Sequence, residues 1–285
     1  MHKSLSLGAA GIAGAQTFSE AAALAARSGF GALDYSVAAL EEQGVGVSEA
    51  RDIMGAHGVV ISSFGLPVSC GTREAFDKTF PRLEKTCRAA SRLGVGRCST
   101  WLMSCSDEYG YAENFRRCKK MYGMCAEVLN EYGIALGLEF LGPKLIWTKG
   151  RHPFIHTLEG MLELCDAIGT GNAGLLLDAY HCYTSGLPGG AFEKLVRGEK
   201  DIVVVHLNDA PAGVPPDELP DSPRLCPGEP GSGGNDTKAF LRALKALGYT
   251  GPVVMEPFSK ALAEMPDDGA RAKAVRESMD SVWPA

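Results

Sequence analysis

The stretch Leu175-Leu176-Leu177-Asp178 joins three apolar residues directly to an ionisable side chain, and three other stretches of the chain repeat this pattern. They are Leu136-Gly137-Leu138-Glu139, Val203-Val204-Val205-His206 and Val253-Val254-Met255-Glu256. A short apolar run is typical of a buried strand, and an ionisable side chain in such a strand is costly unless it is paired or coordinated. The four runs therefore predict buried strands that each end in a functional residue.

Similar β-branched or leucine-rich runs alternate with longer amphipathic runs along the whole chain, which indicates strand–helix units and a parallel sheet. Eight such units predict an α/β fold, a single (β/α)8 TIM barrel that forms one domain over residues 1–285. The expected strands are Ser4–Gly8, Ala32–Ser36, Val59–Phe64, Gly96–Trp101, Ile134–Phe140, Ala173–Tyr180, Ile202–Leu207 and Pro252–Pro257.

Two helices carry clear sequence signals. Thr17 and Glu20 have the spacing of a capping box and precede an Ala/Leu run, which predicts a helix start. Apolar residues repeat every three or four positions between Phe115 and Tyr132, which predicts a helix with one buried face, and Gly133 is expected to end it.

Two long connections follow the fifth and seventh expected strands, at about residues 141–156 and 210–236. Long loops inside a compact domain are usually functional or disordered, and barrel active sites lie at the carboxyl ends of the strands. The second loop is rich in Pro and Gly and is expected to bind substrate.

The last four strands are neighbours in a barrel, so Glu139, Asp178, His206 and Glu256 should converge at one rim and bind one divalent metal ion. One acidic residue at a strand end can simply be solvated or cap a helix, but four consecutive cases are poorly explained in this way. Three carboxylates and an imidazole suit a hard or borderline ion. We expect Mn²⁺ first, with Mg²⁺, Co²⁺ and Zn²⁺ as alternatives.

Four further side chains are candidates for substrate binding. His181 follows Asp178 by three residues, and Asp209 follows His206 by three residues, where it can orient a ligand or bind substrate hydroxyls. Arg224 lies in the tip of the second long loop, with a plain surface arginine as the alternative. Trp101 ends the fourth strand, where it can stack on a sugar face or simply pack at the rim.

Composition narrows the classes of function. A net charge of −6 gives no basic footprint for nucleic acid, and no apolar run reaches the length of about 18 residues that a membrane span needs. Nine cysteines without a Cys-x-x-Cys pair, together with an N-terminus that lacks the features of a signal peptide, predict reduced thiols in a cytoplasmic protein. A homo-oligomer is compatible with exposed barrel helices.

At the proposed ligands the chain resembles the xylose-isomerase-like superfamily of sugar isomerases and epimerases, and within it the inosose (2-keto-myo-inositol) isomerase group. The resemblance covers about residues 130–260 in order and spacing, whereas the first half matches only in its barrel rhythm. It rests on the segments Leu138-Glu139-Phe140, Leu177-Asp178-Ala179-Tyr180-His181, His206-Leu207-Asn208-Asp209, residues 221–229 and Met255-Glu256-Pro257.

The resemblance implies a divalent-metal-dependent isomerase or epimerase of a keto-sugar or keto-inositol that works through an enediolate. It implies that Glu139, Asp178, His206 and Glu256 bind the metal, that Glu139 and Glu256 are also catalytic, and that His181 and Arg224 bind substrate. The chain departs from the family after Gly228, where residues 229–236 form a longer stretch. The lid of the pocket, and with it the substrate, is therefore expected to differ.

Three alternatives remain open from the sequence. The same enediolate serves a dehydratase of the inosose type, or a lyase that eliminates a group from 3-keto-glycosides or C-glycosides. A DNA-repair endonuclease of the superfamily would need a basic groove, which the charge argues against. A non-catalytic barrel would not need four intact ligands.

Overall fold

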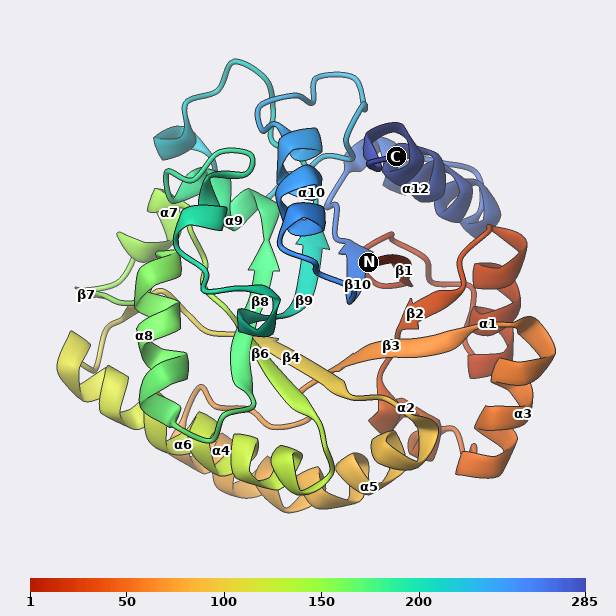
Figure 1. Cartoon of the computed structure of the whole chain (residues 1–285), viewed down its shortest axis with the longest axis horizontal. Coiled ribbons are helices and arrows are strands. Elements are labelled where there is room, and N and C mark those ends of the chain that lie inside the picture. Colours follow the sequence, from red (N-terminus) through yellow and green to blue (C-terminus); the bar gives the residue numbers. More distant parts are fainter.

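Eight parallel strands close into a barrel in the computed structural model, which describes residues 1–285 (Figure 1). Around the ring the order is β1, β10, β9, β8, β6, β4, β3 and β2. The single-barrel prediction is confirmed, and each expected strand is present to within two residues at either end. Their bounds are β1 His2–Ser6, β2 Ala32–Asp34, β3 Val60–Gly65, β4 Arg97–Trp101, β6 Ala135–Glu139, β8 Ala173–Asp178, β9 Ile202–Leu207 and β10 Pro252–Met255.

Helices follow the strands and form the outer ring, and α12 packs against α1 and α10 to close it (Figure 1). Their bounds are α1 Phe18–Arg27, α2 Val37–Glu42, α3 Val47–His57, α4 Arg73–Thr79, α5 Leu83–Leu93, α6 Tyr111–Glu131, α7 Lys144–Trp147, α8 Leu158–Ile168, α9 Ala179–Thr184, α10 Thr237–Ala246, α11 Lys260–Ala263 and α12 Asp268–Val282. The capping box at Thr17 and Glu20 is present. At the end of α6, Gly133 has a φ of 68°, which suits a residue without a Cβ.

The predicted strand Ala173–Tyr180 is two residues too long. Its last two residues open α9, because the Asp178 carboxylate accepts hydrogen bonds from the backbone N–H groups of Tyr180 and His181. A carboxylate in this position caps a helix start. The turn fixes the Asp178 side chain at the carboxyl end of β8.

The first long loop contains structure that its sequence does not suggest. The short helix α7 and the two-residue strand β7 (His152–Pro153) lie within residues 141–156, and β7 pairs with β5 (Cys105–Ser106). The second long loop contains one 3-10 turn, Pro216–Glu218. Both loops lie after the strands that carry the proposed metal ligands.

The register of the sheet shows which side chains point into the barrel. His206 pairs with Asp178 on one side and Val254 on the other, and Trp101 pairs with Glu139, so the members of each pair share a face. Leu176 and Val204 lie two residues before Asp178 and His206, and they form an apolar cluster with Val203 and Val254. The ligand residues therefore stand on an apolar floor at the carboxyl end of the barrel.

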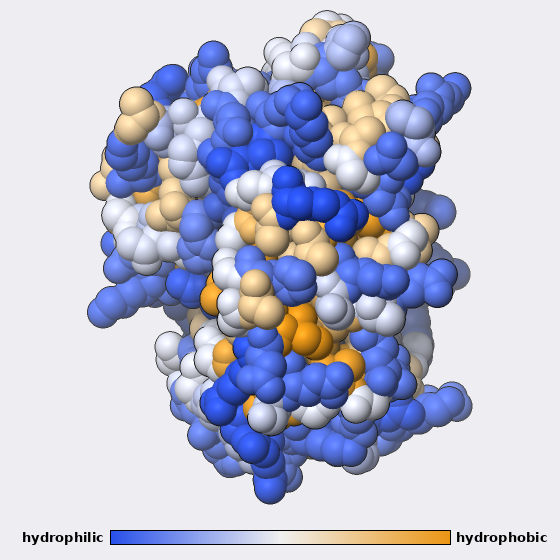
Figure 2. All heavy atoms as spheres, turned by 90° about the vertical axis from the view of Figure 1, so that its right-hand side faces the viewer, coloured by the Kyte–Doolittle hydropathy of each residue, from blue (hydrophilic) through white to orange (hydrophobic).

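No helix is both long enough and apolar enough to cross a membrane. Figure 2 shows the right-hand side of the view in Figure 1, where hydrophilic atoms cover most of the surface and apolar atoms appear in small areas between them.

Candidate metal and substrate site

The structure brings the four proposed metal ligands together at the carboxyl ends of β6, β8, β9 and β10. One side-chain atom from each of Glu139, Asp178, His206 and Glu256 lies within 4.8 Å of all the others. Around His206 Nδ1, the nearest oxygens are Glu256 Oε2 at 3.2 Å, Glu139 Oε1 at 3.6 Å and Asp178 Oδ2 at 4.0 Å. Two ligands on opposite sides of one ion are about 4.2 Å apart, so the set is close to the size of a metal site.

Unpaired buried atoms support the fit of a divalent ion. Glu139 Oε1 and His206 Nδ1 are both fully buried, and neither has a hydrogen-bond partner in the protein. A buried polar atom without a partner is costly, and these two atoms face the same point. Together with two further carboxylates they form a donor set that a divalent cation satisfies.

In the metal-free site the pKa values of the two glutamates are shifted in opposite directions. Burial raises the pKa of Glu139 to about 7, although His206 opposes this shift. Burial also acts to raise the pKa of Glu256, but the His206 and Arg224 charges outweigh it and lower that pKa to about 2. Burial opposes the charged form of His206, yet the surrounding carboxylates raise its pKa well above the ordinary value.

These pKa directions predict that metal binding competes with protons. Metal binding needs Glu139 ionised and His206 neutral at Nδ1, and both groups bind protons near pH 7 because both pKa values are raised. We expect the affinity for Mn²⁺ to fall by at least about tenfold when the pH is lowered from about 7.5 to about 6.5. Calorimetric titrations in buffers of different ionisation enthalpy would measure both affinity and released protons. An affinity that does not change with pH would contradict the assignment.

His181 is buried beside the metal ligands and is held in one tautomer. The backbone N–H of Gly142 donates to His181 Nδ1 at 3.2 Å, and burial lowers the pKa of His181 to about 3. The ring is therefore neutral, with its proton on Nε2, which lies 4.0 Å from Glu139 Oε1. A Cβ on Gly142 would lie 2.3 Å from the His181 carbonyl oxygen, so only glycine fits there.

Arg224 is buried, which excludes the alternative that it is a plain surface arginine. It is 3% exposed, its guanidinium contacts the Glu256 carboxylate, and Nη1 lies 3.4 Å from Asp178 Oδ2. Nη2 donates to Asp221 Oδ1 at 2.7 Å and lies 3.1 Å from His181 Nε2. Since His181 carries its proton on Nε2, two donors face each other there.

Asp209, predicted to orient a ligand or bind substrate hydroxyls, directs its carboxylate to backbone donors of the second long loop. Its carboxylate accepts from the backbone N–H groups of Ala210, Gly233 and Asn235, at 2.7–3.0 Å. Its own backbone bridges to Leu225, the neighbour of Arg224. A short polar side chain that satisfies three backbone donors organises a loop, so Asp209 holds the second long loop in shape.

We expect Asp209→Ala to loosen that loop. Loss of the carboxylate leaves the N–H groups of Gly233 and Asn235 without acceptors, and their hydrogen exchange should accelerate by about tenfold or more. The matched control is Asp236→Ala, which removes a carboxylate that caps α10 through Ala239 N. Unchanged exchange at Gly233 and Asn235 would show that Asp209 does not anchor the loop.

Trp101 lies at the mouth of the barrel, 54% exposed, and pairs with Glu139 on the inner face. A cavity of about 600 Å³ lies beside it between the loops after β3 and β4. Its apolar lining includes Val68, Leu102, Met103 and Tyr122. The position suits contact with a substrate that extends past the metal ligands.

The sequence interpretation missed two residues near the ligands. Asn208 donates from Nδ2 to Asp178 Oδ2 at 2.8 Å, and its buried Oδ1 has no partner. Asp34 ends β2 on the inner face. Asp34 has the same sequence pattern as the proposed ligands, an apolar run followed by an ionisable residue. The run Ala32-Leu33 is, however, too short to predict a strand end.

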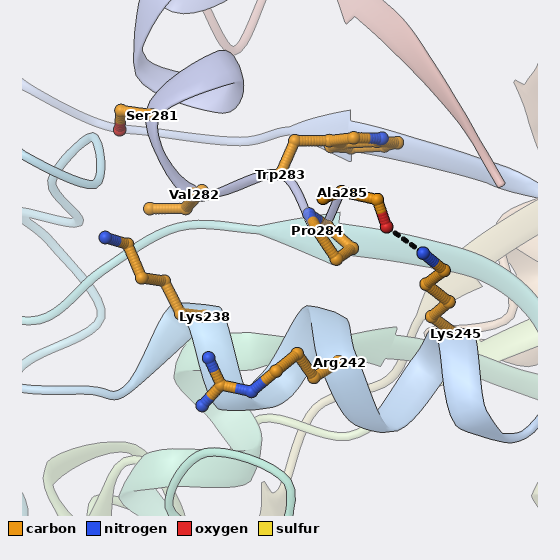
Figure 3. Close-up of a pocket in the computed structure, with 8 residues that line it drawn as sticks. All are labelled: Lys238, Arg242, Lys245, Ser281, Val282, Trp283, Pro284 and Ala285. Atoms are coloured by element: carbon orange, nitrogen blue, oxygen red, sulfur yellow. Dashed lines mark hydrogen bonds between the residues drawn. The ribbon is translucent and has the colours of Figure 1, made fainter.

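A separate surface pocket of about 450 Å³ lies between α10 and the C-terminal segment, away from the metal ligands (Figure 3). Lys238, Arg242 and Lys245 project from α10, and Lys245 contacts the Ala285 carbonyl oxygen. None of the predicted site residues lines this pocket.

Comparisons with known proteins agree with this fold. The family model described as Xylose isomerase-like TIM barrel matches residues 22–283. Inosose isomerase of Bacillus subtilis is 28% identical over 160 residues, 55% of this chain and 52% of the relative, so the chain spans about half the length of the curated relatives it matches.

Two solved structures match over nearly the whole chain. A xylose isomerase domain protein from Alicyclobacillus acidocaldarius has a TM-score of 0.83 at 27% identity, covering 99% of this chain and 98% of that one. The IOLI protein with a bound zinc atom has a TM-score of 0.80 at 17% identity, with the same coverage. With a family model that covers most of its residues and a closed barrel of the same form, the chain belongs to the xylose isomerase-like TIM barrel family.

Proposed function

We propose that this protein is a divalent-metal-dependent isomerase or epimerase of a keto-sugar or keto-inositol. The observation that carries the proposal is the buried group of Glu139, Asp178, His206 and Glu256, in which two atoms without partners, Glu139 Oε1 and His206 Nδ1, lie 3.6 Å apart. The similarity to inosose isomerases supports the substrate class. Mn²⁺ as the ion, a cytoplasmic location and a homo-oligomer stay predictions.

The chemistry moves a proton between the two carbons of an α-hydroxy ketone. A bound divalent ion would stabilise negative charge on the two substrate oxygens as it develops. Glu139 and Glu256 come from strands three apart in the ring and so flank the centre of the mouth. One carboxylate removes the proton from carbon and the other returns it. In an isomerase the proton returns to the neighbouring carbon while the hydroxyl proton passes to the former carbonyl oxygen, and in an epimerase it returns to the opposite face of the same carbon.

His181 and Arg224 complete the proposed site. The Nε2–H of neutral His181 donates to a substrate oxygen, because Gly142 already occupies Nδ1. The Arg224 guanidinium contacts Glu256 and Asp221, which places a buried positive charge beside the proposed metal ligands. It is therefore positioned to hold a substrate oxygen and to keep Glu256 ionised.

A dehydratase or lyase that uses the same site is the second candidate. The cavity of about 600 Å³ beside Trp101 has enough apolar lining to take a leaving group such as an aglycone. Elimination would begin with the same removal of a proton from carbon and would end with loss of water or of that group.

The test is a screen of keto-inositols, ketohexoses and 3-keto-glycosides with metal-loaded protein in D₂O. An isomerase gives a product of the same skeleton with one deuterium bound to carbon, detected by mass spectrometry and NMR. Loss of water or aglycone would instead establish the lyase. Absence of deuterium in product and recovered substrate for every class would overturn proton abstraction and with it the proposal.

A further inference from the structure

Asp34 ends β2, which lies across the barrel from β8 and two strands from β10. In the closed ring β2 is four strands from β8 in both directions, so Asp34 faces Asp178 across the mouth. Ser6 pairs with Asp34, and Ser4, two residues earlier, pairs with Val254 on the inner face. Since alternate residues of a strand share a face, Asp34 points inward in the same layer as the ligands.

One side of the Asp34 carboxyl group is left without a protein partner. Ser63 Oγ donates to Oδ1 at 2.8 Å, and no donor reaches Oδ2. The residue is half-buried, and because it points inward its exposed part opens to the mouth of the barrel. An acceptor in this position is free to receive a hydrogen bond from a bound molecule.

A purely structural role does not account for this carboxyl group. No lysine or arginine forms an ion pair with this half-buried carboxyl group. Burial raises its pKa, and the charges of His206 and Glu256 both act on it, as expected for groups that face one space.

The side chains of Asp34 and Ser63 determine which kind of ligand group can bind at the end of β2. Asp34 and its donor Ser63 together offer an acceptor and no positive charge, so a phosphate at this end would meet repulsion. A hydroxyl group, in contrast, donates to a carboxylate in a charge-assisted hydrogen bond. Asp34 and Ser63 therefore favour a part of the substrate that carries hydroxyl groups and no charge.

We propose that Asp34 is a specificity residue that accepts a hydrogen bond from a substrate hydroxyl. This hydroxyl would lie on the part of the substrate molecule that is farthest from its reacting carbonyl. The proposal rests on the proposed function, and it adds that the substrate is an unphosphorylated polyhydroxy ketone at the end that reaches β2. Ser63 orients the carboxyl group and is a positioning residue.

The test compares Asp34→Ala, Asp34→Asn and Ser63→Ala with wild type, on the substrate found in the screen and on its monodeoxy analogues. The matched control is Ser62→Ala, which removes the neighbouring hydroxyl, bonded to Ser4 and the Leu33 carbonyl oxygen instead of Asp34. Metal affinity is measured on every variant by calorimetry, and folding by thermal melts.

We expect Asp34→Ala to lower kcat/KM by about 10- to 100-fold, mostly through KM, with metal affinity unchanged. Removal of one substrate hydroxyl should lower kcat/KM of wild type by a similar factor and have little further effect in Asp34→Ala. Asp34→Asn keeps the shape and one acceptor oxygen, so it should lose less, and it decides the matter if Asp34→Ala is unstable. Effects no larger than those of Ser62→Ala, or no coupling to any hydroxyl, would overturn the proposal.

The proposed function and this inference can fail separately. If wild type turns over no ketose, binding of myo-inositol to the metal-loaded protein is measured by calorimetry on the same variants. Weaker binding in Asp34→Ala than in Ser62→Ala would retain the hydroxyl site although the isomerase fails. Equal binding in both variants would overturn it.

Discussion

Glu139→Gln and Glu256→Gln are each expected to lower the rate of substrate deuteration by about 100- to 10,000-fold, the range for loss of a general acid or base. An amide keeps the shape of the side chain and one oxygen for the ion, but it cannot take a proton from carbon. Glu139 has its pKa raised to about 7 by burial, whereas Glu256 is held at about 2 beside His206 and Arg224. The two variants thus test two differently tuned carboxylates of one site.

The measurement is the rate of deuterium exchange at carbon with metal content determined for each sample. The metal concentration must be raised until each variant is saturated, because a glutamine is a weaker ligand than a carboxylate. The matched control is Asp201→Asn, a buried carboxylate just before β9 that pairs with Arg197 at 2.7 Å. It lies at the opposite end of the barrel, so it should lower stability and leave the rate per folded molecule unchanged.

Retention of near wild-type exchange by either metal-saturated glutamine variant would remove that glutamate from proton transfer. Loss of exchange in Glu256→Gln alone would leave a one-base mechanism, in which the same carboxylate removes and returns the proton.

The strand ends were predictable because a charged residue after an apolar run is rare and costly in a buried strand. Leu175-Leu176-Leu177-Asp178 shows both features within four letters, and the rhythm of such runs is enough to predict a barrel. Asp34 has only two apolar residues before it in β2, so its inner position becomes visible only through its pairing with Ser6 and Ser63.

The loop residues were harder to predict because their contacts join segments far apart in the chain. Arg224 looks like a loop arginine in the sequence, yet it reaches back to Glu256 and Asp178, 32 and 46 residues away. The spacing of Asp209 after His206 predicts a residue that orients a ligand or binds substrate hydroxyls, yet three backbone N–H groups take up its carboxylate. The spacing of residues along a strand predicts which face of the sheet a side chain points to. It does not predict which hydrogen-bond donors of a distant loop will contact that side chain.

His206→Ala is expected to weaken Mn²⁺ binding by more than about 100-fold, because loss of a direct ligand exceeds the about 10- to 100-fold effect of outer-shell changes. His206 Nδ1 lies within 4.0 Å of an oxygen of each of the three carboxylates, and it has no hydrogen-bond partner in the protein. The variant leaves three carboxylates that face one another, with Arg224 as the remaining cation beside them.

The readout is the rise in melting temperature as Mn²⁺ is added, since an ion that binds only the folded state stabilises it by about 2.7 kcal/mol at 100 times Kd. The control is His57→Ala, which removes an imidazole at the end of α3 on the outside of the barrel. Wild type and His57→Ala should show the same rise, and His206→Ala should show almost none at the same ion concentration. An equal rise in all three proteins would place the ion elsewhere, and the two unpaired atoms of Glu139 and His206 would then need a different explanation.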